Sequence, residues 1–148
     1  MSSLFPRIIV DANILISAYG CDGEVRRYWR ESLRAYKIAV SPEILIEVEA
    51  RLRNGEFNLS SGEIRAILKD IIDRCDVVRP SPPRDPKFEN SKDAHIAALA
   101  RHQFADGVSA TFLLTGDDAL CREGRIGKCR ILGIGEFCNS DDCIPGTD

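Results

Sequence analysis

The fold is decided by the stretch Ala110-Thr111-Phe112-Leu113-Leu114-Thr115-Gly116-Asp117-Asp118, in which an apolar run ends in small and acidic residues. A short apolar run bounded by turn-forming residues predicts a strand buried on both faces of a parallel sheet. The run Ile8-Ile9-Val10 ends in the same way, at Asp11. We therefore expect two buried strands, each followed at its carboxyl end by an aspartate.

On either side of this stretch, short β-type runs alternate with helical patterns, as in a parallel sheet flanked by helices. Ser41-Pro42 provides an N-cap and a first-turn proline, and Ser60 to Glu63 has capping-box spacing. Four prolines between Arg79 and Lys92 predict a constrained loop. The predicted elements are further strands over 38–40, 76–78 and 129–132; helices over 42–53, 60–72 and 94–104; a helix carrying the apolar stripe Val25, Tyr28, Trp29, Leu33 and Tyr36; and short helices after Asp118 and near Glu136.

The chain length of 148 residues suits one domain. We expect a single domain over 1–138 and an acidic, flexible tail over 139–148. No apolar run approaches the roughly 20 residues needed to span a bilayer, and the first residues do not resemble a secretory signal. We therefore expect a cytoplasmic protein without a membrane partner.

The charges are unevenly distributed along the chain. The net charge is −3, but the last ten residues contain three acids and no base, which leaves 20 acidic and 20 basic side chains in the rest. Residues 1–138 are therefore neutral overall. If their acidic side chains gather in one site, their basic side chains lie elsewhere on the surface, where they could bind phosphates.

The six cysteines contain no Cys-x-x-Cys pair, and reduced thiols are the expectation for a cytoplasmic chain. A zinc site built from Cys129, Cys138 and Cys143 would need unusual spacing and a fourth ligand. Packing is the favoured role of the cysteines.

Four acidic residues are candidates for one pocket: Asp11, Glu47, Asp93 and Asp117. Ligands of open α/β sheets gather beyond the carboxyl ends of the strands. Two carboxylates about 5 Å apart repel by roughly 3 kcal/mol at an effective dielectric near 20, so a cluster needs protons, bases or a cation. Oxygen ligands favour Mg²⁺ or Mn²⁺, which can activate water and neutralise charge on a phosphodiester.

Each of these residues also has a purely structural interpretation, because capping and i, i+4 ion pairs are common. Helical geometry alone does not choose between Glu47 and Glu49. The structural alternatives are helix capping by Asp11 or Asn13, ion pairs of Glu47 with Arg51 and of Glu49 with Arg53, a helix-dipole role for Asp93, and a capping box from Thr115 to Asp118.

Four segments in this order resemble the PIN-domain nucleases, and most closely the small VapC-like toxins of toxin–antitoxin systems. The resemblance extends from Arg7 to about Phe137. It is carried by the segments Ile8-Ile9-Val10-Asp11-Ala12-Asn13-Ile14-Leu15-Ile16-Ser17-Ala18, Ser41-Pro42-Glu43-Ile44-Leu45-Ile46-Glu47, Lys92-Asp93-Ala94-His95-Ile96-Ala97-Ala98-Leu99-Ala100 and Leu114-Thr115-Gly116-Asp117.

The resemblance implies a three-layer α/β/α fold with a central parallel sheet of four to five strands, and a Mg²⁺- or Mn²⁺-dependent endoribonuclease acting on RNA. It also implies a homodimer and an antitoxin partner that blocks the acidic site. The metal ligands would be Asp11, Glu47, Asp93 and Asp117, oriented by Asn13 and Thr115. Many relatives have a further aspartate where this chain has Ala119, and Asp118 would be an imperfect substitute.

The alternative function is a catalytically inactive PIN-like scaffold that binds RNA or a protein partner. A receiver-type phosphorylation switch lacks its paired acids and its lysine, a haloacid dehalogenase lacks its second aspartate, and no P-loop is present. His95 could touch the substrate, whereas His102 is expected to be structural. The arginines between Arg26 and Arg34 are expected to be solvated. The candidates for phosphate contacts near the acids are Arg101, Arg122, Arg125 and Lys128.

Overall fold

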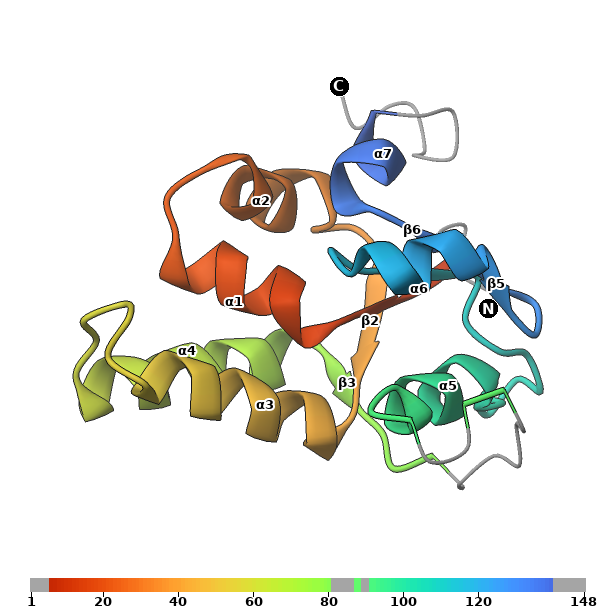
Figure 1. Cartoon of the computed structure of the whole chain (residues 1–148), viewed down its shortest axis with the longest axis horizontal. Helices are drawn as coiled ribbons and strands as arrows, with labels where there is room; N and C mark the ends of the chain where they lie inside the picture. Colours follow the sequence, from red (N-terminus) through yellow and green to blue (C-terminus); the bar gives the residue numbers. More distant parts are fainter. Residues whose placement is uncertain (1–5, 81–86, 89–90, 140–148) are drawn as a thin grey trace.

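A computed structural model of the protein describes residues 6–80, 87–88 and 91–139. Its centre is a six-stranded sheet in the order β3-β2-β1-β4-β6-β5, flanked by helices (Figure 1). All neighbouring strands are parallel except β5, which runs antiparallel to β6. The strands are β1 (Arg7–Val10), β2 (Lys37–Val40), β3 (Asp76–Val77), β4 (Phe112–Leu114), β5 (Arg125–Ile126) and β6 (Cys129–Leu132).

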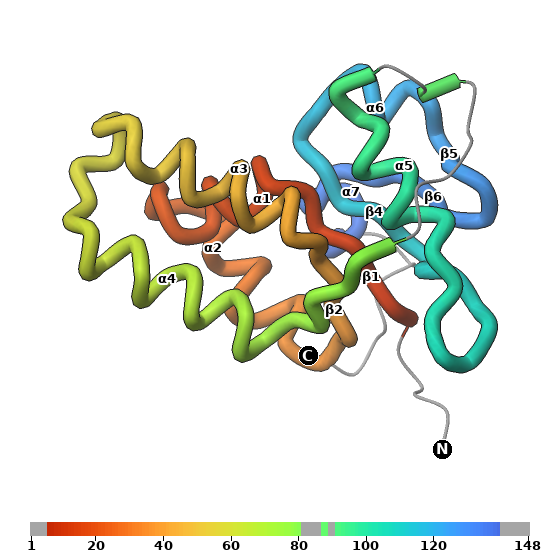
Figure 2. The backbone as a smooth tube through the Cα atoms, turned by 90° about the horizontal axis from the view of Figure 1, so that it is seen from below, coloured from red at the N-terminus to blue at the C-terminus, as the bar shows by residue number. Residues whose placement is uncertain are grey.

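The helices lie between the strands along the chain, except the last helix, which follows the last strand. They are α1 (Ala12–Gly20), α2 (Glu24–Arg27), the π-helix η1 (Tyr28–Ser32), α3 (Pro42–Arg53), α4 (Ser61–Arg74), α5 (Ala94–Arg101), α6 (Asp118–Glu123) and α7 (Ile134–Cys138). Helices α3 and α4 extend together on one side of the molecule, away from α5, α6 and β5 (Figure 2). This arrangement leaves β1 and β4 in the middle of the sheet.

The order of the strands reverses between β1 and β4. From β1 the chain moves outward through β2 to β3, and it then returns to add β4 and β6 on the other side of β1. Val10 and Leu114, the last residues of β1 and β4, are paired in register. The residues that follow them, Asp11 and Thr115, therefore emerge side by side at the carboxyl edge of the sheet. In open α/β sheets, ligands bind at such a switch point.

Burial of the central strands explains their sequence. Ile8, Ile9 and Val10 are fully buried, as are Leu113 and Leu114. Continuous apolar runs are expected in strands covered on both faces. The predicted strands at both positions are confirmed, and the predicted α/β class with them.

The two long helices form where their capping residues predicted. The Ser41 hydroxyl accepts a hydrogen bond from the Ile44 backbone N–H at the start of α3. Ser60 and Glu63 form a reciprocal capping box at the start of α4. These caps satisfy backbone donors that lack partners within the helix.

Two predicted helices differ from the structure. The helix expected over the stripe from Val25 to Tyr36 is only four residues of α-helix followed by the π-helix η1, although Tyr28, Trp29, Leu33 and Tyr36 are buried as the stripe predicted. Helix α5 ends at Arg101, because the backbone of His102 is extended.

The sheet also has a sixth strand beyond the expected four to five. The unpredicted strand, β5, forms a tight hairpin with β6, which requires a residue with positive φ, supplied by Gly127 (φ 60°). Two residues per strand are too few for an alternation to be visible in the sequence.

The helix that follows Asp11 is anchored at its far end. The Tyr19 hydroxyl on α1 accepts a hydrogen bond from Trp29 Nε1 (2.9 Å) and donates one to Asp70 on α4 (2.5 Å). Arg26, expected to be solvated, donates to the backbone carbonyls of Ala18 and Tyr19. These bonds join α1 to η1 and α4, so the start of α1 is held in place by contacts some distance from the sheet.

Some expectations fall outside the described residues. These are Cys143, most of the proline-rich loop, and all of the expected acidic tail except Asn139. The five described cysteines are free thiols. Among the described helices, none combines the length and the apolar character needed to cross a membrane.

Candidate metal-binding site at the carboxyl edge of the sheet

Asp11 occupies the switch point. It follows β1 directly and its side chain is only 7% exposed. One carboxylate oxygen, Oδ1, accepts a hydrogen bond from the Ala12 backbone N–H (2.8 Å), and Oδ2 accepts one from the Thr115 hydroxyl (2.9 Å). Asp11 is the N-cap of α1. The structural interpretation of Asp11 as a helix cap therefore accounts for only one of its two carboxylate oxygens. The second oxygen faces β4.

Thr115 links the two aspartates that end β1 and β4. It is fully buried, and besides donating to Asp11 its hydroxyl oxygen accepts a hydrogen bond from the Asp117 backbone N–H (3.1 Å). Asn13 completes the network: its amide oxygen accepts from the Gly116 N–H (2.9 Å), and its amide nitrogen lies 3.4 Å from the Thr115 hydroxyl oxygen. These bonds join segments more than 100 residues apart.

Asp117 is held by the helix that it caps. Its Oδ1 accepts hydrogen bonds from the backbone N–H groups of Ala119 (2.8 Å) and Leu120 (3.2 Å). The N-cap of α6 is therefore Asp117, and the capping box suggested from Thr115 to Asp118 is wrong. Because Oδ1 alone serves the cap, Oδ2 of Asp117 is without a hydrogen bond among the described residues.

Asp93 is the third carboxylate of the group. It occupies the N-cap position of α5, but its side chain makes no capping hydrogen bond, so a charge interaction with the helix dipole is the structural role that remains for it. Partial burial and the charge of Asp117, and more weakly that of Asp11, raise the pKa of the Asp93 carboxyl above its ordinary value, against the opposing charges of Lys92 and His95. Asp93 therefore lies within the electrostatic reach of the other two aspartates.

Glu47 and Glu49, which the sequence did not distinguish, have different surroundings in the structure. The Glu49 carboxylate forms an ion pair with Arg53 (3.0 Å), as predicted. Glu47 is exposed and forms no ion pair within the described part of the chain, because Arg51 instead pairs with Glu56. The predicted Glu47–Arg51 pair is thus wrong. Glu47 keeps an uncommitted carboxylate on α3, although no contact places it beside the three aspartates.

The carboxylates do not form a closed metal cage. In the described part of the chain, no group of three or more His, Cys, Asp and Glu side chains is arranged so that it could hold a metal ion. Mg²⁺, however, usually keeps several waters and is bound through one or two carboxylates together with substrate phosphates. An all-oxygen set with mutual repulsion and a carboxylate oxygen to spare on Asp117 has the donor chemistry for such a cation.

The remaining residues predicted near the site differ in their surroundings. Asp118 and Ala119 are both exposed at the start of α6. The Nδ1 atom of His95 is buried and has no hydrogen-bond partner among the described residues. His102 packs edge-on against Phe104, with 4.8 Å between ring centroids, in agreement with a structural role.

Two of the predicted phosphate contacts lie at the opposite edge of the sheet. Asp93 is at the start of α5 and Arg101 at its end, which separates them by about 12 Å along a helix of 8 residues. Lys128 directly precedes β6, at the amino end of that strand. The expectation that proximity in sequence would bring Arg101 and Lys128 to the acids is therefore wrong.

The electrostatics of Asp93 lead to a stability prediction. Neutralising it by Asp93→Asn should raise the free energy of unfolding of the metal-free protein at neutral pH by on the order of 1 kcal/mol after screening, or roughly 3–5 °C in Tm. The same variant should gain less stability than the wild type from added Mn²⁺, since a ligand that binds only the folded state stabilises it by mass action. Thermal melts of both proteins in EDTA and in Mn²⁺ provide the measurement.

The sign of the pH dependence follows from the raised pKa. Because the folded protein holds the Asp93 proton more tightly than the unfolded chain, this residue favours folding at low pH, and that contribution is lost as the pH rises through the folded pKa. The difference in Tm between variant and wild type should thus shrink as the pH is lowered. A purely helix-dipole role predicts the reverse in EDTA, a variant less stable by roughly 0.3–1 kcal/mol.

These features define a class of protein: an α/β domain with a carboxylate site at the switch point of a mostly parallel sheet. The chain belongs to the PIN domain family, whose model matches residues 7–119. This is a family of nucleases.

The fold is also similar to a solved structure, the crystal structure of PAE2754 from Pyrobaculum aerophilum. The two structures superpose with a TM-score of 0.56, covering 93% of this chain and 96% of the other, at 17% sequence identity. At this identity the likeness concerns the fold alone. No curated protein gives a significant sequence match.

Proposed function

We propose that this protein is a divalent-metal-dependent endoribonuclease, and that it is the toxin of a toxin–antitoxin pair. The observation that carries the nuclease proposal is the Thr115 hydroxyl, which connects Asp11 to Asp117 at the switch point, within electrostatic reach of Asp93. Membership of a nuclease family supports a role for these acidic residues in phosphodiester hydrolysis.

In this proposal, Asp11, Glu47, Asp93 and Asp117 would hold Mg²⁺ or Mn²⁺. The cation would supply positive charge to stabilise the negative charge that develops on the phosphodiester during hydrolysis. The Thr115 hydroxyl donates a hydrogen bond to Asp11 Oδ2, and the Asn13 amide nitrogen lies 3.5 Å from the same oxygen. Both would hold the charged oxygens in place before RNA binds. No protein nucleophile is required, and Asp118 would be an auxiliary acid beside Ala119.

The toxin part of the proposal rests on the resemblance to the small VapC-like proteins. It includes a homodimer and an antitoxin protein that blocks the acidic edge, with activity in the cytoplasm. The competing proposal, an inactive scaffold that binds RNA or a partner, draws its support from Ala119, where many relatives have an acid. A metal requirement for RNA cleavage separates the two.

The test is RNA cleavage by purified protein in Mn²⁺ and in EDTA. We expect an RNA oligonucleotide to be cut in Mn²⁺ and left intact in EDTA, with activity restored by excess Mn²⁺. Cleavage that persists in EDTA would contradict the metal mechanism, and absence of cleavage under all metals tested would favour the scaffold.

Two neighbouring glutamates on α3 provide a matched pair for the same assay. Glu47→Gln should lower the cleavage rate at least about 10-fold, because a metal ligand loses its charge. Glu49→Gln should leave the rate within about 2-fold and cost at most about 0.5 kcal/mol of stability, since it removes only an exposed ion pair with Arg53. Equal rates for the two variants would exclude Glu47 from the site.

A further inference from the structure

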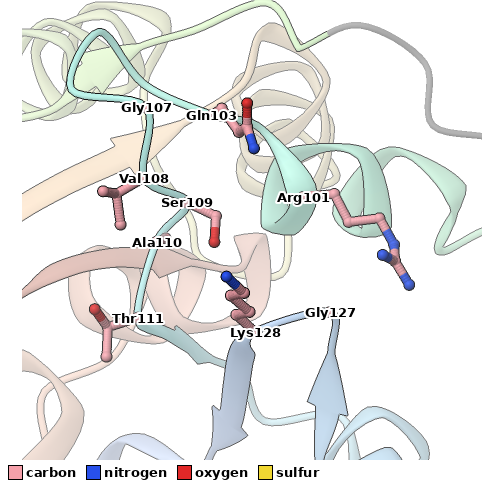
Figure 3. Close-up of a pocket in the computed structure, with 9 residues that line it drawn as sticks. All are labelled: Arg101, Gln103, Gly107, Val108, Ser109, Ala110, Thr111, Gly127 and Lys128. Carbon is pink, nitrogen blue, oxygen red and sulfur yellow. The ribbon is translucent and has the colours of Figure 1, made fainter.

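The edge of the sheet opposite the acids contains a pocket. Its volume is about 340 Å³, at the lower end of the roughly 300–1,000 Å³ typical of small-molecule sites. It lies between the end of α5, the segment leading into β4, and the turn between β5 and β6 (Figure 3). The side chains that bear on its chemistry are Arg101, Gln103, Val108, Ser109, Thr111 and Lys128.

The segments that form this pocket are basic. Residues 124–130 contain Arg125, Lys128 and Arg130 and no acid. The only acid in 101–111 is Asp106, which forms an ion pair with Arg7 (3.7 Å). The first residues of β1 and β2 at this edge are also basic, Arg7 and Lys37. Basic side chains therefore predominate at this edge, whereas Asp11 and Asp117 follow β1 and β4 at the opposite edge.

Lys128 is the central cation of the pocket. It is exposed, and its ammonium has no ion pair or hydrogen bond with any described residue. Figure 3 shows the Lys128 amine and the Ser109 hydroxyl directed toward each other, whereas the Thr111 side chain, also part of the lining, lies apart from them. An ammonium and a hydroxyl that face each other in one pocket suit an anion with several acceptor oxygens.

Gly127 lets Arg101 lie against the same turn. A Cβ atom on Gly127 would be 3.3 Å from Arg101 Nη1 and 3.7 Å from its Cζ, so the guanidinium packs closely against the glycine. Arg101 therefore adds a second positive charge to the pocket lining, with its guanidinium apart from the Lys128 amine (Figure 3). Val108, also in the lining, is 58% exposed and offers an apolar surface beside these charges.

We propose that this pocket binds a nucleoside phosphate, either as a free mononucleotide or as one unit of an RNA strand. Lys128 pairs with the phosphate and Ser109 donates a hydrogen bond to one of its oxygens, while Arg101, Thr111 and Val108 line the part of the pocket that the ribose and base would occupy. The proposal does not depend on nuclease activity, because binding at this edge requires neither the acids nor a metal.

The experiment is a titration of the full chain in EDTA with adenosine monophosphate, adenosine, inorganic phosphate and a short fluorescent single-stranded RNA. Amide signals of Gly107, Ser109, Gly127 and Lys128 in ¹H–¹⁵N NMR spectra should shift with the monophosphate and barely with adenosine. Wild-type spectra with no such shift for the monophosphate or the RNA would overturn the proposal.

A charge-reversal variant measures how much Lys128 contributes to binding. Lys128→Glu should weaken binding of the phosphate-bearing probe at least about 10-fold, the size expected for losing a charge-assisted hydrogen bond. The matched control is Arg65→Glu, the same charge change at an exposed position of α4 without an ion pair in the described structure, and we expect less than about a 2-fold effect. Equal weakening by both would show nonspecific attraction and overturn the proposal.

The probes also separate the two sources of the phosphate. If the monophosphate displaces RNA, both use the pocket; if only RNA binds in a Lys128-dependent way, the ligand is a strand. A circular dichroism melt of Lys128→Glu checks folding, and the wild-type NMR titration is informative even if this variant is unstable. If RNA is cleaved in Mn²⁺ but the pocket binds nothing, only this inference fails.

Discussion

Substitution of Asp11 by asparagine is expected to lower the Mn²⁺-dependent RNA cleavage rate at least about 100-fold, the size of effect seen when one electrostatic stabiliser of a transition state is removed. Asp11 is the most buried of the four candidate acids and has a carboxylate oxygen directed at the Thr115 hydroxyl. Asparagine keeps the shape and one acceptor oxygen, so the cap on α1 can persist while the charge is lost. The measurement is an initial rate of cleavage at saturating Mn²⁺.

Asp22→Asn is the matched control for this variant. Asp22 is an almost fully exposed acid beyond the far end of α1, 3.9 Å from Arg26. The same chemical change there should leave the rate within about 2-fold, because an exposed ion pair contributes little. A folded Asp11→Asn variant with wild-type activity would mean that Asp11 acts only as a helix cap.

The second large effect is expected in living cells. Induction of the wild-type chain alone in bacteria should arrest growth, whereas Asp93→Ala should permit it. The reason is that an unopposed endoribonuclease destroys cellular RNA, and Asp93 is proposed to be one of the metal ligands that make cleavage possible. Growth curves after induction, with soluble protein quantified in parallel, provide the measurement.

Asp73→Ala on α4 serves as the control for this pair. Asp73 is exposed and forms an ion pair with Lys69, so its loss should leave the arrest intact. Equal growth of cells expressing the wild type and Asp93→Ala, at equal soluble amounts, would argue against a toxin while leaving the biochemical nuclease assay as a separate question.

The sequence predicted the elements whose signals are local. Apolar runs identified β1 and β4, and the caps at Ser41 and Ser60 identified the starts of α3 and α4, because these features depend on a few neighbouring residues. Where the backbone departs from the regular period, local signals failed. Examples are the π-helix at Tyr28–Ser32 and the two-residue strand β5.

For the candidate site, the sequence alone predicted which residues would carry chemistry: aspartates placed just after buried strands, in an order that resembles one nuclease family. Only the tertiary structure decided their relations. The register of β1 with β4 brings Thr115 to Asp11, and the direction of α5 places Arg101 at the far edge of the sheet. Arg51 forms its ion pair with Glu56 and so leaves Glu47 unpaired among the described residues. The physical reason is that residue type and capping are properties of short segments, whereas hydrogen bonds across more than 100 residues depend on strand order and helix direction, which no single segment encodes.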